Sequence, residues 1–135
     1  MSATQVMIWN NRSMIAAQFL RLRKPDDELT QIAKDVWCTD GQLAAHCDST
    51  EPGLVVYGMV LLNDLDLELH YRNGVFPLKP GDAYCIDAHQ HHSAIAGGGA
   101  KRNGLFAVRV WDIYPGLSLA NFVEQATAEP IEWMP

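Results

Sequence analysis

The chain has 135 residues, of which 48% are hydrophobic, so it is long enough to form one domain around its own core. Its formal net charge of -6 disfavours non-specific binding to nucleic acid, and no run of about 18 apolar residues suggests a membrane span. Cys38, Cys47 and Cys85 form no close CxxC pair, which is typical of reduced thiols, and we expect a cytoplasmic protein.

The first 40 residues are predicted to support the main sheet with two strands and a helix. Residues 5–9 and 14–22 are apolar and flank a turn-like cluster at residues 10–13, which favours two early strands. Residues 26–37 begin with an acidic turn and then place apolar side chains at helical spacing. This pattern predicts one amphipathic helix packed on a sheet.

Beyond residue 41 the hydrophobic period changes to two, which is typical of short strands. Asn73-Gly74 predicts a hairpin turn and Pro80-Gly81 a second turn, with a flexible connection at residues 97–99. A closing helix is predicted over residues 117–127. The predicted strands cover residues 54–62, 65–70, 75–78, 83–86, 91–95 and 105–111.

About eight short strands joined by tight turns, with one or two packed helices, predict a mainly β fold of the β-sandwich or jelly-roll type. We expect a single domain over residues 1–135, in which residues 1–40 support a core formed by residues 41–112. Phe106 and Trp111 are expected to be core residues.

His46-Cys47-Asp48 is the first candidate functional motif. On a strand, residues i and i+2 point to the same face, so the imidazole and the carboxylate can meet at one ion while Cys47 faces away. A second histidine would complete a two-histidine, one-carboxylate site, which holds ferrous iron and leaves positions open for oxygen and substrate. A polar strand end beside a loop is the alternative interpretation.

A family resemblance becomes specific at residues 80–86 and the following cluster His89-Gln90-His91-His92-Ser93. This turn, strand and histidine resemble the second half of the double-stranded β-helix site that cupins share with 2-oxoglutarate-dependent iron oxygenases. With His46 and Asp48 before it and an arginine after it, the pattern is similar to the oxygenase signature. The resemblance spans residues 41–112 and implies a cupin-like double-stranded β-helix.

The resemblance also implies roles for individual residues. It makes His46, Asp48 and His92 the ligands of Fe(II), and it makes Arg102 the anchor for the distal carboxylate of 2-oxoglutarate. Arg109 competes for that role, and Tyr57 and Ser93 are further candidates for binding the cosubstrate. The implied reaction uses molecular oxygen to hydroxylate or demethylate a substrate while 2-oxoglutarate is decarboxylated to succinate.

Two other interpretations stay open. A set of five residues resembles the first motif of a small metal-binding cupin: Gly41, His46, Asp48, Glu51 and Gly58. In that protein His46, Glu51 and His92 would hold the metal, Asp48 or a water would complete the site, and 2-oxoglutarate would have no part. The third interpretation is a metal-free jelly-roll binding domain.

The remaining histidines are not expected to bind the metal. His89 and His91 are expected in a loop or beside the ligands, and His70 on a solvated face. We expect a small molecule or a peptide as substrate, and pairing through sheet edges would give a homodimer.

Overall fold

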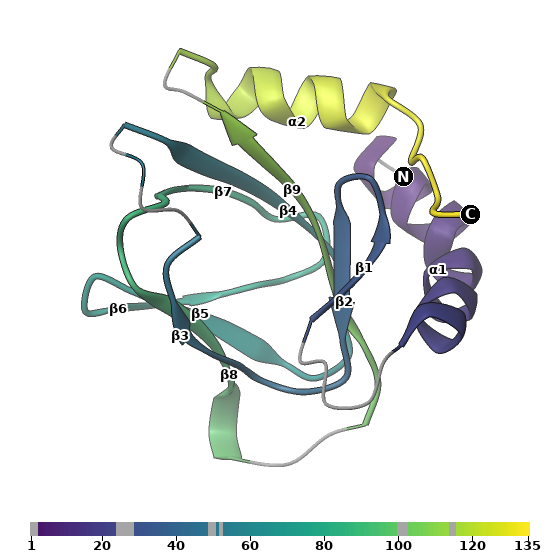
Figure 1. Cartoon of the computed structure of the whole chain (residues 1–135), viewed down its shortest axis with the longest axis horizontal. Coiled ribbons are helices and arrows are strands. Elements are labelled where there is room, and N and C mark those ends of the chain that lie inside the picture. Colours follow the sequence, from purple (N-terminus) through teal and green to yellow (C-terminus); the bar gives the residue numbers. More distant parts are fainter. Residues whose placement is uncertain (1–2, 24–28, 49–50, 52, 100–102, 114–115) are drawn as a thin grey trace.

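The computed structural model describes residues 3–23, 29–48, 51, 53–99, 103–113 and 116–135. Within these residues two antiparallel sheets face each other, and two helices lie outside the larger sheet (Figure 1). This arrangement confirms the predicted mainly β, jelly-roll architecture of the double-stranded β-helix type. Neither helix is long and apolar enough to cross a membrane.

The larger sheet has five strands in the order β1-β2-β9-β4-β7, and the smaller sheet has four in the order β3-β8-β5-β6. Strands of the larger sheet are β1 (Thr30–Ala33), β2 (Val36–Thr39), β4 (Val55–Asn63), β7 (Ala83–Asp87) and β9 (Phe106–Ile113). Strands of the smaller sheet are β3 (Leu43–His46), β5 (Leu67–Tyr71), β6 (Gly74–Pro77) and β8 (His92–Ala96). The helices are α1 (Ala3–Leu22) and α2 (Leu119–Ala128), and Gly97–Gly99 form a 3₁₀ turn after β8.

Helix α1 replaces the two strands predicted for residues 5–9 and 14–22. The supposed turn at residues 10–13 lies inside the helix. Ile15, Phe19 and Leu22 recur at helical spacing and pack against the larger sheet. Burial of this stripe outweighs the weak helix propensity of the Asn-Asn-Arg-Ser cluster, which explains why the prediction was wrong.

The β1–β2 hairpin replaces most of the helix predicted for residues 26–37, whose first three residues lie outside the described part of the chain. An irregular register between Gln31 and Ala33 lets the neighbouring residues Ile32 and Ala33 both be buried. Together with the buried Val36, this doublet imitates the spacing of a helix. The period alone therefore could not distinguish the two structures.

The later elements follow the prediction closely, with one shift at a turn. The hairpin between β5 and β6 has Arg72 and Asn73 as its central residues, with φ angles of 50° and 62°, so the turn lies one residue earlier than predicted. Gly74 belongs to the strand, and a Cβ there would lie 2.7 Å from the ring of Phe76. The Pro80-Gly81 turn and the closing helix are confirmed.

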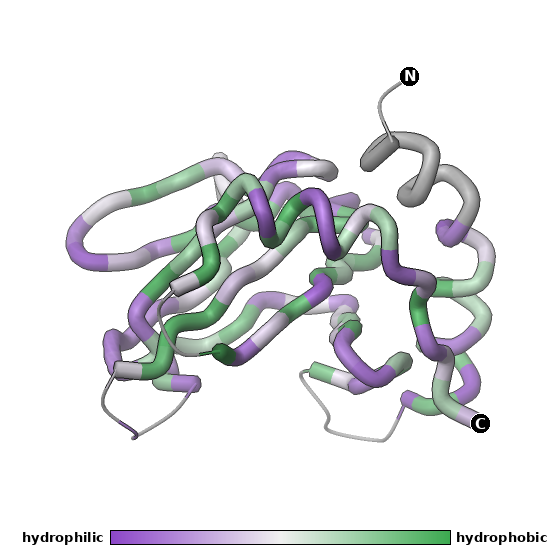
Figure 2. The backbone as a smooth tube through the Cα atoms, turned by 90° about the horizontal axis from the view of Figure 1, so that it is seen from above, coloured by the Kyte–Doolittle hydropathy of each residue, from purple (hydrophilic) through white to green (hydrophobic). Residues whose placement is uncertain are grey.

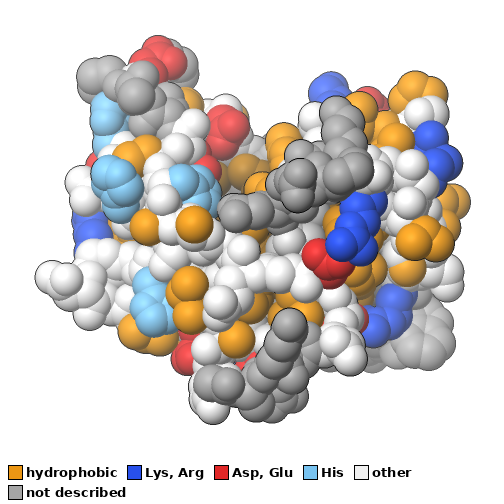
Figure 3. All heavy atoms as spheres, turned by 60° about the horizontal axis from the view of Figure 1, so that its bottom comes forward, with side chains coloured by type: hydrophobic (Ala, Val, Ile, Leu, Met, Phe, Trp, Pro, Cys, Tyr) orange, Lys and Arg blue, Asp and Glu red, His pale blue; other side chains and the backbone are white. Residues whose placement is uncertain are grey.

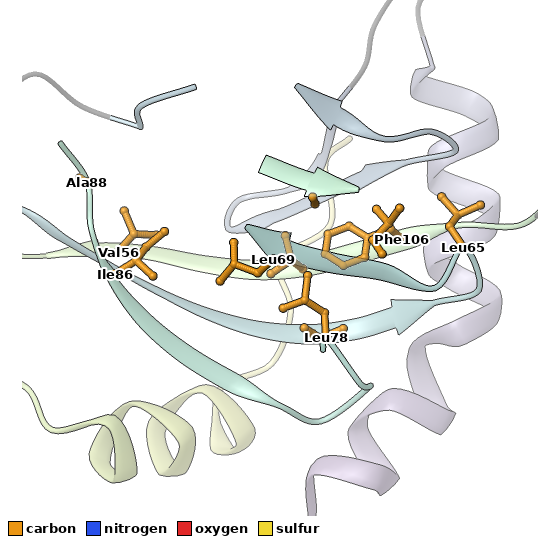
Figure 4. Packing of buried hydrophobic residues seen from close by; sticks show 11 residues of the cluster. Val56, Leu65, Leu69, Leu78, Ile86, Ala88 and Phe106 are labelled. Carbon is orange, nitrogen blue, oxygen red and sulfur yellow. The ribbon is translucent and has the colours of Figure 1, made fainter. Parts of the chain in front are cut away.

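The main core lies between the two sheets, where side chains of both inner faces meet (Figure 4). It includes Val56, Leu69, Leu78 and Phe106, all buried. Hydrophilic residues concentrate at several loop ends around this interior (Figure 2). The core places the inward-facing residues of β3 and β8 opposite those of β4, β7 and β9.

The outer face of the larger sheet holds a buried ion pair beneath α2. Arg109, which is 2% exposed, donates from Nε to Asp35 Oδ2 at 2.7 Å and from Nη1 to carbonyl oxygens of Ala126 and Glu129. Trp111 Nε1 donates to the same carboxylate oxygen at 2.6 Å. One guanidinium thus joins the β1–β2 turn to the C-terminal end of the helix.

We predict that Arg109→Leu lowers the free energy of unfolding by about 3–5 kcal/mol, because it leaves the buried charge of Asp35 without its cation and the helix carbonyls without their donor. Urea denaturation followed by circular dichroism measures the change. Arg23→Leu is the matched control, since Arg23 is half exposed and its pair with Asp40, at 2.8 Å, should contribute no more than about 1 kcal/mol. Equal losses in the two variants would contradict a structural role for the buried pair.

Candidate metal site

The pairing of β3 with β8 brings two histidines together. His46 ends β3, His92 begins β8, and the register of this antiparallel pair places them directly opposite each other. Their ring centroids are 4.4 Å apart, and the rings are tilted by 56°. Residues 46 positions apart in the sequence therefore share one small region at the end of the smaller sheet.

Asp48 lies between the two imidazoles. Its Oδ1 is 3.3 Å from His46 Nε2, and its Oδ2 is 3.2 Å from His92 Nε2. One ligand atom from each of these residues lies within 4.8 Å of the others. Donors bound to one ion at about 2.0–2.2 Å are separated by roughly 3–3.5 Å, so the three side chains fit around a single divalent cation with modest adjustment.

Backbone carbonyl groups orient both rings. His46 Nδ1 is 2.7 Å from the carbonyl oxygen of Ala44, and His92 Nδ1 is 3.2 Å from that of Gln90. A carbonyl oxygen only accepts, so each Nδ1 carries the proton and each Nε2 is turned toward Asp48. This is the arrangement that ligating imidazoles require, with the outer nitrogen held by a fixed acceptor. The acceptor for His92 is therefore a peptide group rather than His89 or His91.

The electrostatics of the site centre on Asp48. The side chain of His92 is 10% exposed, against 40% for His46 and 27% for Asp48. Burial alone would lower the pKa of His92, but the hydrogen bond to Asp48 and the charge of that carboxylate raise it above the usual value. The backbone N–H of Asp48 donates to the carbonyl of Ala88 at 3.1 Å, which fixes the residue beyond the end of β3.

A cavity of about 70 Å³ begins at the three residues and extends between the sheets. Its wall is almost entirely apolar, and Ser93 and Tyr84 contribute its hydroxyl groups. No lysine or arginine is among the described residues that line it. The apolar lining consists of Leu29, Leu43, Val56, Leu69, Leu78, Ala94, Phe106, Val108 and Val110.

The other predicted site residues separate into three groups. Ser93 lines the cavity, and Arg102 lies outside the described residues. Arg109 and Tyr57 face the opposite side of the larger sheet, where Tyr57 donates to the carbonyl of Leu117 and packs against α2. Because side chains alternate along β9, the residues that face the cavity are Phe106, Val108 and Val110, so a role for Arg109 as a carboxylate anchor at this site is not supported.

Glu51, the carboxylate of the cupin alternative, is exposed and is not part of the three-residue cluster. Cys47 faces away from the site, as expected, and its Sγ lies 3.4 Å from His91 Nδ1. Histidine side chains group on one side of this face of the molecule (Figure 3). His70 and His91 line a depression of about 500 Å³ on the surface of the smaller sheet, which His92 and Ser93 also line.

Sequence reasoning missed Tyr84 and Asp112. Burial raises the pKa of Tyr84, and the charges of Asp48 and then Asp112 raise it further. Partial burial and the charge of Asp48 raise the pKa of Asp112. The sequence did hold one signal for Tyr84: Gly58 is a glycine inside a predicted strand, and such a glycine often marks a place where another group lies close to the backbone.

We predict that the apparent pKa of His92, followed by NMR of its ring protons in metal-free protein, lies above about 6.5 and falls in Asp48→Asn. Because the pKa is raised on folding, the pair stabilises the protein below the unfolded pKa, and this contribution disappears as the pH rises through the folded value. Asp87→Asn, which removes a carboxylate paired with Arg72, is the control and should leave His92 unchanged. An unaltered His92 titration in Asp48→Asn would refute the coupling.

No protein-family model matches the sequence, and no curated protein matches it. Among solved structures, a predicted oxalate decarboxylase from Thermotoga maritima aligns with a TM-score of 0.46 and 15% identity over 77% of this chain and 73% of its own. KdgF from Halomonas sp. aligns with a TM-score of 0.45 and 16% identity, over 67% and 84% of the two chains. A cupin-2 domain protein from Shewanella frigidimarina aligns with a TM-score of 0.41 and 12% identity, over 74% and 91%.

Proposed function

We propose that this chain is a small metal-dependent enzyme of the cupin type, in which His46, Asp48 and His92 hold a divalent cation and a small molecule binds beside it without 2-oxoglutarate. The observation that supports this proposal is the convergence of two oriented imidazoles and one carboxylate at the end of an apolar cavity. Two nitrogen donors and one oxygen donor with open positions suit Fe(II), which we take as the preferred ion.

The protein's own groups have separate tasks in this proposal. The carbonyls of Ala44 and Gln90 hold the Nδ1 protons, so Nε2 is the metal-binding nitrogen of each ring, and His92 would release the Nε2 proton that it donates to Asp48 when the ion binds. Asp48 supplies the only negative charge in the cluster, and the mainly apolar wall lowers the local polarity beside the ion. When bound, a ferrous ion would supply Lewis acidity, redox chemistry and open positions for the substrate and oxygen.

The size and lining of the cavity argue against 2-oxoglutarate as cosubstrate. A cavity of about 70 Å³ is too small to enclose this five-carbon dicarboxylate, and no described lining residue offers it a cation. One observation does favour the oxygenase as a second candidate: the carboxylate that meets the two histidines is Asp48, as the His-x-Asp signature predicts, rather than Glu51.

We predict that the apo protein binds one equivalent of Fe(II) or Co(II) anaerobically, and that His46→Ala, Asp48→Ala or His92→Ala each abolishes binding because each removes a ligand. Isothermal titration calorimetry measures the affinity. Glu51→Ala and His70→Ala are matched controls, each removing a potential ligand outside the cluster, and should bind the metal as the wild type does. Loss of binding in Glu51→Ala with retention in Asp48→Ala would overturn this ligand set.

We further predict that 2-oxoglutarate leaves the visible spectrum of the anaerobic Fe(II) protein unchanged, because the cavity cannot enclose it. A charge-transfer band that appears with 2-oxoglutarate and weakens in Arg102→Ala would instead establish the oxygenase. Absence of any metal binding would leave the metal-free jelly roll as the remaining interpretation.

A further inference from the structure

Tyr84 reaches the middle of the larger sheet because its cross-strand neighbour has no side chain. Tyr84 of β7 is paired with Gly58 of β4, which is paired on its other side with Val110 of β9. A Cβ at Gly58 would lie 2.1 Å from Tyr84 Cζ and 2.4 Å from its hydroxyl oxygen. The phenol therefore occupies the space that a side chain of residue 58 would fill.

This position puts the hydroxyl group on the wall facing the candidate metal site. Tyr84 belongs to the larger sheet, His46 and His92 belong to the smaller one, and all three line the same cavity. A phenol is protonated at neutral pH, so Tyr84 can donate a hydrogen bond into this cavity. A protonated donor in an apolar enclosure favours a ligand that brings its own acceptor.

The charges of the site indicate which acceptor fits. A divalent cation held by two neutral imidazoles and one carboxylate retains one positive charge, which favours a monoanion in an apolar cavity. A short-chain carboxylate can place one oxygen at the ion and the other toward the phenol. The volume of about 70 Å³ leaves room for only a few non-hydrogen atoms beyond that group.

We propose that the hydroxyl group of Tyr84 positions a small monoanionic oxygen ligand at the His46-Asp48-His92 ion, and that its ring, seated on Gly58, limits the size of the enclosed ligand. This inference rests on the proposed function, since it requires a metal at the three residues. Tyr84 contributes no ligand to the ion, so its loss should change the binding of the small molecule without changing the binding of the metal.

The test uses Co(II)-loaded protein and follows its visible spectrum during titration with propionate and, separately, benzoate. We expect propionate to perturb the spectrum of the wild type and benzoate to leave it unchanged. Tyr84→Phe keeps the ring, so Co(II) affinity should stay within about twofold while propionate binds about three- to tenfold more weakly, as expected for one lost hydrogen bond. Tyr57→Phe, a buried tyrosine on the opposite face of β4, should bind propionate normally.

Gly58→Ala tests the position of the phenol separately from its presence. The added methyl group must displace the end of the Tyr84 side chain, so propionate should bind more weakly although the hydroxyl group is retained. Circular dichroism checks that each variant is folded.

The outcomes separate the two proposals. If wild-type protein binds no Co(II), the proposed function fails and this inference fails with it. If Co(II) binds but propionate has no effect, or binds wild type and Tyr84→Phe equally, only the role of Tyr84 is refuted. Unchanged propionate binding in Gly58→Ala, or tight binding of benzoate, would overturn the size limit and the placement of the ring.

Discussion

The pairing register of β3 and β8 is the constraint on which the site depends. It sets His46 directly across from His92, and Asp48 follows two residues later on the same side. A shift of one residue would send one imidazole to the outer surface, because side chains alternate along a strand. Apolar residues such as Ala94, buried further along β8, oppose that shift. Core packing therefore fixes the geometry of the polar cluster.

Asp48 is the electrostatic centre of the inner end of the barrel. Its charge raises the pKa values of three groups that come from three different strands, His92, Tyr84 and Asp112. The effects differ in sign, because a raised pKa favours the positively charged form of the imidazole but the neutral form of the phenol and of the carboxylic acid. A cation at the cluster would offset the charge of Asp48, so occupancy of the site is coupled to protonation across the cavity.

The sequence predicted the elements that obey a simple local rule. A continuous apolar run at residues 54–62 located β4, and short apolar segments between turn residues located β5 to β9. The i, i+2 rule placed His46 and Asp48 on one side. His92 required the family resemblance, because strand pairing is not encoded locally. Strands were predicted where helix α1 lies, and a helix was predicted where the β1–β2 hairpin lies. The turn-like cluster inside α1 and the irregular register of β1 produced these two errors. Tyr84 was missed because its position depends on a glycine 26 residues away in the sequence.

Both helices pack on the larger sheet, with α2 fastened by Arg109, whereas neither makes extensive contact with the smaller sheet among the described residues (Figure 1). The two walls of the cavity therefore differ in support: the wall that carries the phenol is backed by helices, and the wall that carries the histidines is not. Local opening draws on the least supported elements. Breathing of the smaller sheet would then widen the gap between the two walls and ease the entry of small molecules into the apolar cavity.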